Sequence, residues 1–126
     1  MQEVKFYYCE NCGNMVQAIH HLSAPIMCCG KKMALLEPGT VEASHEKHIP
    51  AVQTQKNTVA VQIGEVEHPM IPEHSILWVY LQTDRGGQMK YLHPDDEPKA
   101  EFALHDEKPI AVYAYCNLHG LWKTEL

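Results

Sequence analysis

Residues 110–120 read Ile-Ala-Val-Tyr-Ala-Tyr-Cys-Asn-Leu-His-Gly, and this stretch combines a β-strand pattern with two residue types that bind transition metals. Its first six residues are β-branched, aromatic or small and apolar, which is typical of a strand. Cys116 continues the alternation of Val112 and Ala114, so we expect its side chain on their face of the strand. The Cys-x-x-His spacing then allows Cys116 and His119 to bind one metal ion at the strand end.

Four further runs have the composition or alternation of short strands. They cover residues 58–63, 75–83, 89–92 and 101–104. Two turn signals separate them, Asp84-Arg85-Gly86-Gly87 and His93-Pro94-Asp95-Asp96. No stretch keeps a 3.6-residue apolar period for ten residues, so we expect a mainly β protein whose larger part is a β-sandwich or barrel.

The composition excludes several classes of protein. The chain has 126 residues, of which 45% are hydrophobic and 21% charged, and this predicts one globular domain or two small ones. Its apolar runs are too short to span a bilayer, so we expect no membrane association. A net charge of -6 without a Lys or Arg cluster argues against nucleic-acid binding. The N-terminus shows no secretory signal, which favours a cytoplasmic location.

Five cysteines and nine histidines are many for this length, and an odd cysteine count argues against complete disulfide pairing. Four of the cysteines come early, as Cys9-Glu10-Asn11-Cys12-Gly13 and Cys28-Cys29-Gly30. A Pro-Gly turn signal follows at residues 37–40, so we place a boundary between domains 1–37 and 38–126. A domain of about 37 residues needs a metal or another crosslink to fold. Four thiolates can bind zinc or iron in a tetrahedral site, and the spacing alone favours neither metal.

The fifth cysteine, Cys116, has several histidines as candidate partners. His48 lies in Glu-Lys-His-Ile-Pro, His68 and His74 lie in a Pro-containing segment, and His119 follows Cys116 at the Cys-x-x-His spacing. A single loop histidine is usually a solvated side chain, and the remaining five histidines carry no such context. They are His20, His21, His45, His93 and His105.

Over essentially its whole length, the sequence resembles the desulfoferrodoxins, the two-iron form of superoxide reductase. The cysteine-rich segment is similar to desulforedoxin, and the strings EKHIP, EHPM, EHSI and CNLHG are similar to neelaredoxin-type catalytic domains. The resemblance implies a first iron bound by four cysteines: Cys9, Cys12, Cys28 and Cys29. It implies a second iron with four equatorial histidines and one axial thiolate: His48, His68, His74, His119 and Cys116.

The same resemblance implies an immunoglobulin-like β-sandwich for the larger domain, a homodimer and a rubredoxin-like electron donor. It also places Glu46 and Lys47 beside an open sixth position on the second iron. The implied reaction is one-electron reduction of superoxide to hydrogen peroxide, with Lys47 attracting the anion and Glu46 binding the oxidised iron. Two alternatives stay open: a zinc-stapled β-sandwich that stores or senses metal, and a one-electron carrier that uses the four-cysteine iron alone.

Overall fold

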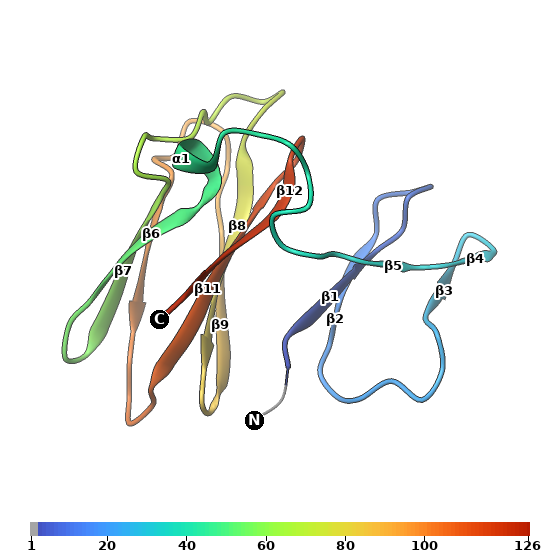
Figure 1. Cartoon of the computed structure of the whole chain (residues 1–126), viewed down its shortest axis with the longest axis horizontal. Helices are drawn as coiled ribbons and strands as arrows, with labels where there is room; N and C mark the ends of the chain where they lie inside the picture. Colours follow the sequence, from blue (N-terminus) through green and yellow to red (C-terminus); the bar gives the residue numbers. More distant parts are fainter. Residues whose placement is uncertain (1–2) are drawn as a thin grey trace. The chain divides into compact units, whose positions relative to one another are not determined.

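The computed structural model describes residues 3–126 and is mainly β (Figure 1). Its contacts divide the chain into two compact units, Met1–Glu37 and Pro38–Leu126. No helix in the described residues is long and apolar enough to cross a membrane.

The first unit contains two small antiparallel sheets. β1 (Lys5–Tyr8) lies between β2 (Met15–Ala18) and β5 (Ala34–Leu35), and β3 (Met27–Cys28) pairs with β4 (Lys31–Lys32). Few residues of this unit are buried, among them Phe6, Cys9 and Met33. So small an apolar core contributes little stability, which is consistent with the need for a crosslink.

The second unit is a sandwich of two antiparallel sheets (Figure 1). The three-stranded sheet has the order β10-β7-β6, with β6 (Pro50–Thr54), β7 (Thr58–Ile63) and β10 (Lys99–Ala103). The four-stranded sheet has the order β12-β11-β8-β9, with β8 (Ile76–Thr83), β9 (Gly86–Tyr91), β11 (Pro109–Cys116) and β12 (Gly120–Glu125). The immunoglobulin-like β-sandwich expected from the sequence is confirmed.

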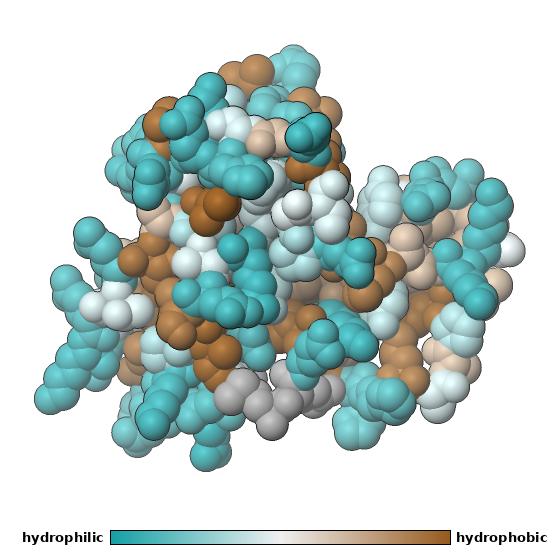
Figure 2. Space-filling model, in the orientation of Figure 1, coloured by the Kyte–Doolittle hydropathy of each residue, from teal (hydrophilic) through white to brown (hydrophobic). Residues whose placement is uncertain are grey.

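Alternate residues of the facing strands form the core between the sheets, because side chains alternate across a strand. From β7 these are Val59, Val61 and Ile63, and from β11 they are Val112, Ala114 and Cys116. Cys116 is therefore buried at the end of an apolar row, on the face that the sequence predicted. Hydrophilic side chains cover most of the surface that Figure 2 shows.

The sequence predicted no strand in the first unit, where the structure has β1 to β5, and in the second unit β6, β9 and β12 differ most from the prediction. β6 and β12 were not predicted, because β6 lacks a strong β-branched run and β12 begins inside the ligand motif. β9 starts at Gly86, within a predicted turn. Gly87 pairs with Gln82 of neighbouring β8, and a Cβ at Gly87 would collide with the hydroxyl group of Tyr80 where that group now lies.

The one helix in the described residues is α1 (His45–His48), a single turn. In Figure 1 it lies at the same end of the sandwich as the loop after β7 and the turn between β11 and β12. This end of the sandwich therefore gathers segments that are far apart in the sequence.

Candidate metal centres

The first candidate centre is a group of four cysteine sulfurs that all lie within 4.8 Å of one another. Cys9 directly follows β1 and begins a tight turn, in which the N–H of Gly13 donates to the carbonyl of Cys9 at 2.8 Å. Gly13 has a φ of 81°, a conformation that glycine adopts without strain. This turn brings Cys12 back toward the β3–β4 hairpin, where the sulfurs of Cys12 and Cys28 are 3.6 Å apart.

The adjacent cysteines reach the same point because they occupy a two-residue hairpin turn. Cys28 pairs with Lys31, so Cys29 and Gly30 form the loop between β3 and β4. Both loop residues have positive φ, 51° and 74°, the combination that type I′ hairpins require. This conformation explains how two successive side chains can face one metal, which the sequence left as a question.

The pKa values of these thiols favour the binding of a cation. Hydrogen bonds from the backbone, chiefly at Cys12, lower the pKa of Cys9 to about 6. The neighbouring thiol of Cys9, followed by that of Cys12, raises the pKa of Cys28 to about 12. Without metal, a negative charge is thus stabilised on Cys9, while Cys28 keeps its proton. A bound metal ion replaces those protons.

The second candidate centre lies at the end of the sandwich that gathers α1 and the two loops. His48 ends α1, His68 and His74 lie between β7 and β8, Cys116 ends β11, and His119 lies in the turn before β12. Donor atoms of His48, His68, His74 and Cys116 all lie within 4.8 Å of one another. Nδ1 of His119 is 3.1 Å from Nε2 of His48 and 3.8 Å from the sulfur of Cys116.

Backbone carbonyls fix which ring nitrogens face this point. Nδ1 of His48 is 2.6 Å from the carbonyl oxygen of Ser44, and Nδ1 of His68 is 2.7 Å from that of Pro69. A carbonyl can only accept a hydrogen bond, so both Nδ1 atoms carry the proton and both Nε2 atoms present a lone pair.

Two of the inward nitrogens, on His68 and His74, are poorly paired within the protein. The Nε2 atoms of His48 and His68 are 3.1 Å apart, where two lone pairs repel each other. Nε2 of His74 is buried and has no hydrogen-bond partner. A cation at this point satisfies all three nitrogens together with the thiol, so the residues present fit a transition metal with N and S ligands.

Burial keeps these imidazoles neutral. It lowers the pKa of His68 to about 4 and also lowers the pKa values of His48 and His74. Burial raises the pKa of the Cys116 thiol, against hydrogen bonds from the backbone at Leu118 and His119. Neutral imidazoles are the form that binds metal, whereas Cys116 gives up its proton when metal binds.

Glu46 and Lys47 precede His48 in α1, and both side chains are exposed. The positive charge of Lys47 contributes, after burial, to the lowered pKa values of His48 and His74. Lys47 is therefore close enough to act electrostatically on the centre. The five histidines without a supporting motif are all exposed.

Sequence reasoning missed two residues that support the second centre. The indole N–H of Trp122 donates to the carbonyl of His119 at 3.1 Å, and its ring centroid is 5.1 Å from that of His48. A Cβ at Gly64 would lie 2.6 Å from the carbonyl oxygen of Glu46, so only glycine allows α1 to approach this closely. Neither residue belongs to a ligand motif, so the sequence carried no signal for them.

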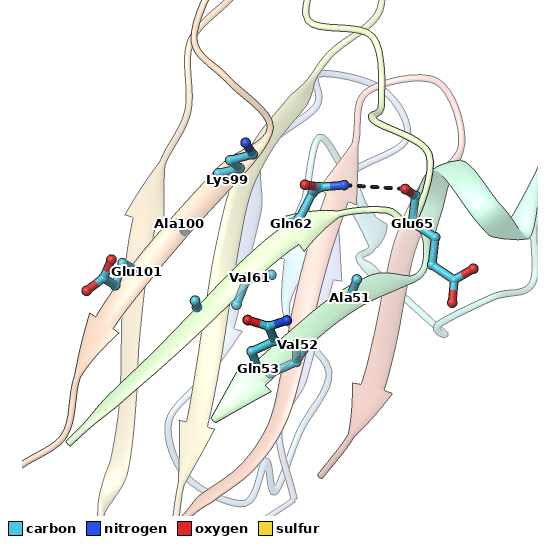
Figure 3. A pocket seen from close by; sticks show the side chains of 10 residues that line it. Ala51, Val52, Gln53, Val61, Gln62, Glu65, Lys99, Ala100 and Glu101 are labelled. Atoms are coloured by element: carbon cyan, nitrogen blue, oxygen red, sulfur yellow. Dashed lines mark hydrogen bonds between the residues drawn. The ribbon is translucent and has the colours of Figure 1, made fainter. Parts of the chain in front are cut away.

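A separate pocket of about 680 Å³ lies on the outer face of the three-stranded sheet (Figure 3). Small and amide side chains of β6, β7 and β10 line much of it, and Gln62 donates from Nε2 to the carbonyl of Glu65 at 3.4 Å. Its lining contains no cysteine or histidine, so it offers none of the donors of the two centres.

Comparison with known proteins agrees with this arrangement. A relative from Syntrophotalea carbinolica named desulfoferrodoxin is 40% identical, with 98% of each chain covered. A protein from Pyrococcus abyssi named superoxide reductase is 36% identical, covering 64% of this chain and 86% of that protein. The crystal structure of the superoxide reductase from Treponema pallidum gives a TM-score of 0.82 at 34% identity, with 98% of each chain covered.

A β-sandwich with one tetrathiolate group and one histidine–cysteine group defines a two-centre metalloprotein. The family model described as Desulfoferrodoxin matches residues 40–125, and the relatives extend the match over nearly the whole chain. The chain belongs to the desulfoferrodoxin family.

Proposed function

We propose that this chain is a superoxide reductase that converts superoxide to hydrogen peroxide at its second centre. The supporting observation is the convergence of lone-pair nitrogens and one thiol at a buried point, including the unpartnered Nε2 of His74. It occurs in a member of the desulfoferrodoxin family whose relatives include named superoxide reductases. The proposed iron ligands are His48, His68, His74, His119 and Cys116.

Iron held by these residues would supply the one electron that, together with two protons, reduces superoxide to hydrogen peroxide, and an external donor would then restore that electron. The protein residues prepare the centre for this chemistry. The carbonyls of Ser44 and Pro69 orient two imidazoles, and burial keeps them neutral. The Cys116 thiolate donates electron density and favours the oxidised state of the metal.

Lys47 and Glu46 are the proposed catalytic residues on α1. Lys47 attracts superoxide, because its exposed ammonium group lies beside the centre in a chain of net charge -6. We assign Glu46 as a carboxylate ligand of the oxidised centre. The visible spectrum of oxidised Glu46→Ala tests this assignment: a changed spectrum is expected, and a spectrum identical to that of the parent contradicts it.

The first centre completes the proposal of two irons per chain. Cys9, Cys12, Cys28 and Cys29 are its proposed ligands, in a desulforedoxin-like domain of residues 1–37. The neelaredoxin-type catalytic domain is then residues 38–126. The four-sulfur group in the first unit and the nitrogen–sulfur group in the second support this division of roles.

By resemblance to its family, the chain forms a homodimer, works in the cytoplasm and receives electrons from a rubredoxin-like protein. Sedimentation of the iron-loaded protein tests the dimer. Reduction of the oxidised protein by a purified rubredoxin tests the donor. These steps make it part of an electron-transport chain that removes superoxide under oxidative stress.

The alternative of a zinc-stapled module without catalysis is not favoured, since the relatives and structural neighbours include superoxide reductases. Colour separates the two, because ferric thiolate centres absorb visible light and zinc centres do not.

The Cys116→Ser variant tests the site assignment. We expect it to lose most of the peroxide formed per superoxide while it keeps the first iron. A one-electron carrier that uses only the four-cysteine iron would retain its activity in this variant, and that result would contradict the proposal.

A further inference from the structure

The side chain of Asn117 links the segment that carries His74 to the turn that carries Cys116 and His119, three of the proposed ligands of the second centre. Asn117 lies between Cys116 and His119, in the turn from β11 to β12. Its Nδ2 donates to the carbonyl of Glu73 at 3.0 Å, and its Oδ1 accepts from the N–H of Ser75 at 3.0 Å. The amide thus hydrogen-bonds the backbone on both sides of His74.

A third bond strengthens this connection. The backbone N–H of Asn117 donates to the carbonyl of Ser75 at 3.2 Å, and Ser75 is buried. His74 itself exchanges backbone bonds with Ile71, each 3.1 Å long. The His74 segment is therefore fixed to its own loop on one side and to the turn of Cys116 and His119 on the other.

The chemistry of this link is specific for an amide. The His74 segment presents one carbonyl and one N–H, and an asparagine side chain offers one donor group and one acceptor in fixed directions. An aspartate of the same shape keeps the acceptor and places a second oxygen against the carbonyl of Glu73. A leucine of similar volume makes neither bond.

We propose that Asn117 is a positioning residue for the second centre: it keeps His74 in register with Cys116 and His119, so that their donor atoms converge. This inference rests on the proposed metal site. Groups that orient metal ligands typically change metal affinity by about 10- to 100-fold when they are removed.

Iron release from the full-length, iron-loaded protein tests the proposal. Asn117→Leu and Asn117→Asp are each mixed with a ferrous chelator, and the metal released is timed and counted. We expect second-centre iron to leave Asn117→Leu about 10- to 100-fold faster than the parent, with Asn117→Asp intermediate. The four-cysteine centre serves as the internal reference and keeps its release rate. Asn57→Asp, an exposed asparagine in the turn between β6 and β7, controls for the added charge.

A spectroscopic measurement separates positioning from a general loss of stability. In the oxidised variants, we expect the thiolate charge-transfer absorption of the second centre to shift, because His74 no longer keeps its place relative to Cys116 and His119. Equal release rates and an unchanged band in both Asn117 variants would overturn the proposal. Faster release from both centres alike would overturn it too, since that pattern indicates global destabilisation.

A parent protein without iron at the second centre would refute the proposed function, whereas a parent with iron and unaffected variants refutes only the role of Asn117.

Discussion

Lys47 shows how one residue can change the electrostatics of this chain. The net charge of -6 repels superoxide at long range, yet the ammonium group of Lys47 lies close enough to lower the pKa values of buried histidines in the centre. A local positive charge beside a site raises the rate at which an anion encounters it, and salt screens this effect.

The first prediction concerns this lysine. Lys47→Ala slows the second-order reaction with superoxide by about 10-fold at low ionic strength and flattens its dependence on salt. Pulse radiolysis at several salt concentrations measures both quantities. Lys56→Ala removes an exposed lysine between β6 and β7 and is expected to react like the parent. A parent-like rate in Lys47→Ala would exclude the attraction that we assign to it.

Burial of His68 predicts how the metal-free protein responds to acid. Its pKa is about 4 in the folded chain and 6.5 for an ordinary histidine, so above pH 6.5 neither state binds a proton there. Between pH 6.5 and 4 the unfolded state takes up a proton that the folded state does not. The folded state therefore loses about 3 kcal/mol of stability over this window, and no more below it.

Urea unfolding of the metal-free protein between about pH 7.5 and pH 4 measures this loss. This range runs from about one unit above the ordinary pKa of histidine down to the lowered pKa of His68. His68→Gln should reduce the pH dependence, to which His48 and His74 still contribute, whereas His105→Gln, an exposed control, should retain all of it. A parent whose stability is constant over this range would contradict the burial argument.

At the residue level, the sequence was most informative about side chains that bind metal directly. Cysteine and histidine in short motifs carry a recognisable spacing, and the structure brings the candidates together in two groups. The contacts of Asn117 with the His74 segment and of Trp122 with His48 leave no such spacing, although both residues lie near Cys116 and His119 in the sequence. Their roles depend on backbone groups that only the folded chain brings near.

At the scale of single elements, α1 is held by close backbone contacts at the end of the sandwich that carries the second centre. It is one turn long, and the N–H of Val66 donates to the carbonyl of Glu46 at 3.0 Å. Gly64 packs directly against its backbone, and an added Cβ would lie 2.9 Å from the carbonyl oxygen of Ile49. Because these neighbours are backbone atoms, a larger side chain must displace the helix itself.

Gly64→Ala is therefore predicted to move α1 and the residues it carries. We expect a loss of about 1–3 kcal/mol in stability and about a 10-fold slower reaction with superoxide, because small displacements of reacting groups are costly. Chemical denaturation and rapid mixing measure the two effects. Ala60→Ser adds one atom on the exposed face of β7 and serves as a control. A Gly64→Ala variant with parental stability and rate would show that α1 has more room than the structure indicates.

Element prediction from sequence succeeded where alternation was strong. β7 was predicted with its observed bounds, and β8 and β11 to within one residue at each end. The β3–β4 hairpin was missed because its turn uses Cys29 in a left-handed conformation, which cysteine rarely adopts. The proposed role of Cys29 as a metal ligand, rather than turn propensity, accounts for the choice of residue there.

For the whole molecule, the two centres lie in different units, Met1–Glu37 and Pro38–Leu126. The sandwich has its own apolar core, whereas the first unit has few buried residues. We therefore expect the first centre to stabilise its own unit and the second centre to react with superoxide without it.

Cys12→Ser tests this independence. We expect iron to fall from about two to about one per chain and the first unit to lose stability, because structural metal sites contribute folding free energy directly. The rate of peroxide formation by the second centre should stay within about twofold of the parent, because Cys12→Ser changes no ligand of that centre. A matching loss of peroxide formation would mean that the first iron is needed for catalysis.

The central claim is that this chain reduces superoxide at an iron held by four histidines and Cys116, and the stoichiometry of the reaction tests it most directly. The protein is first shown to contain iron and to absorb visible light, then fully reduced and mixed with superoxide in the absence of a donor. We predict one hydrogen peroxide for each electron lost from the second centre, with no oxygen released. Release of oxygen together with peroxide, as in dismutation, or a colourless protein that forms no peroxide, would contradict the account.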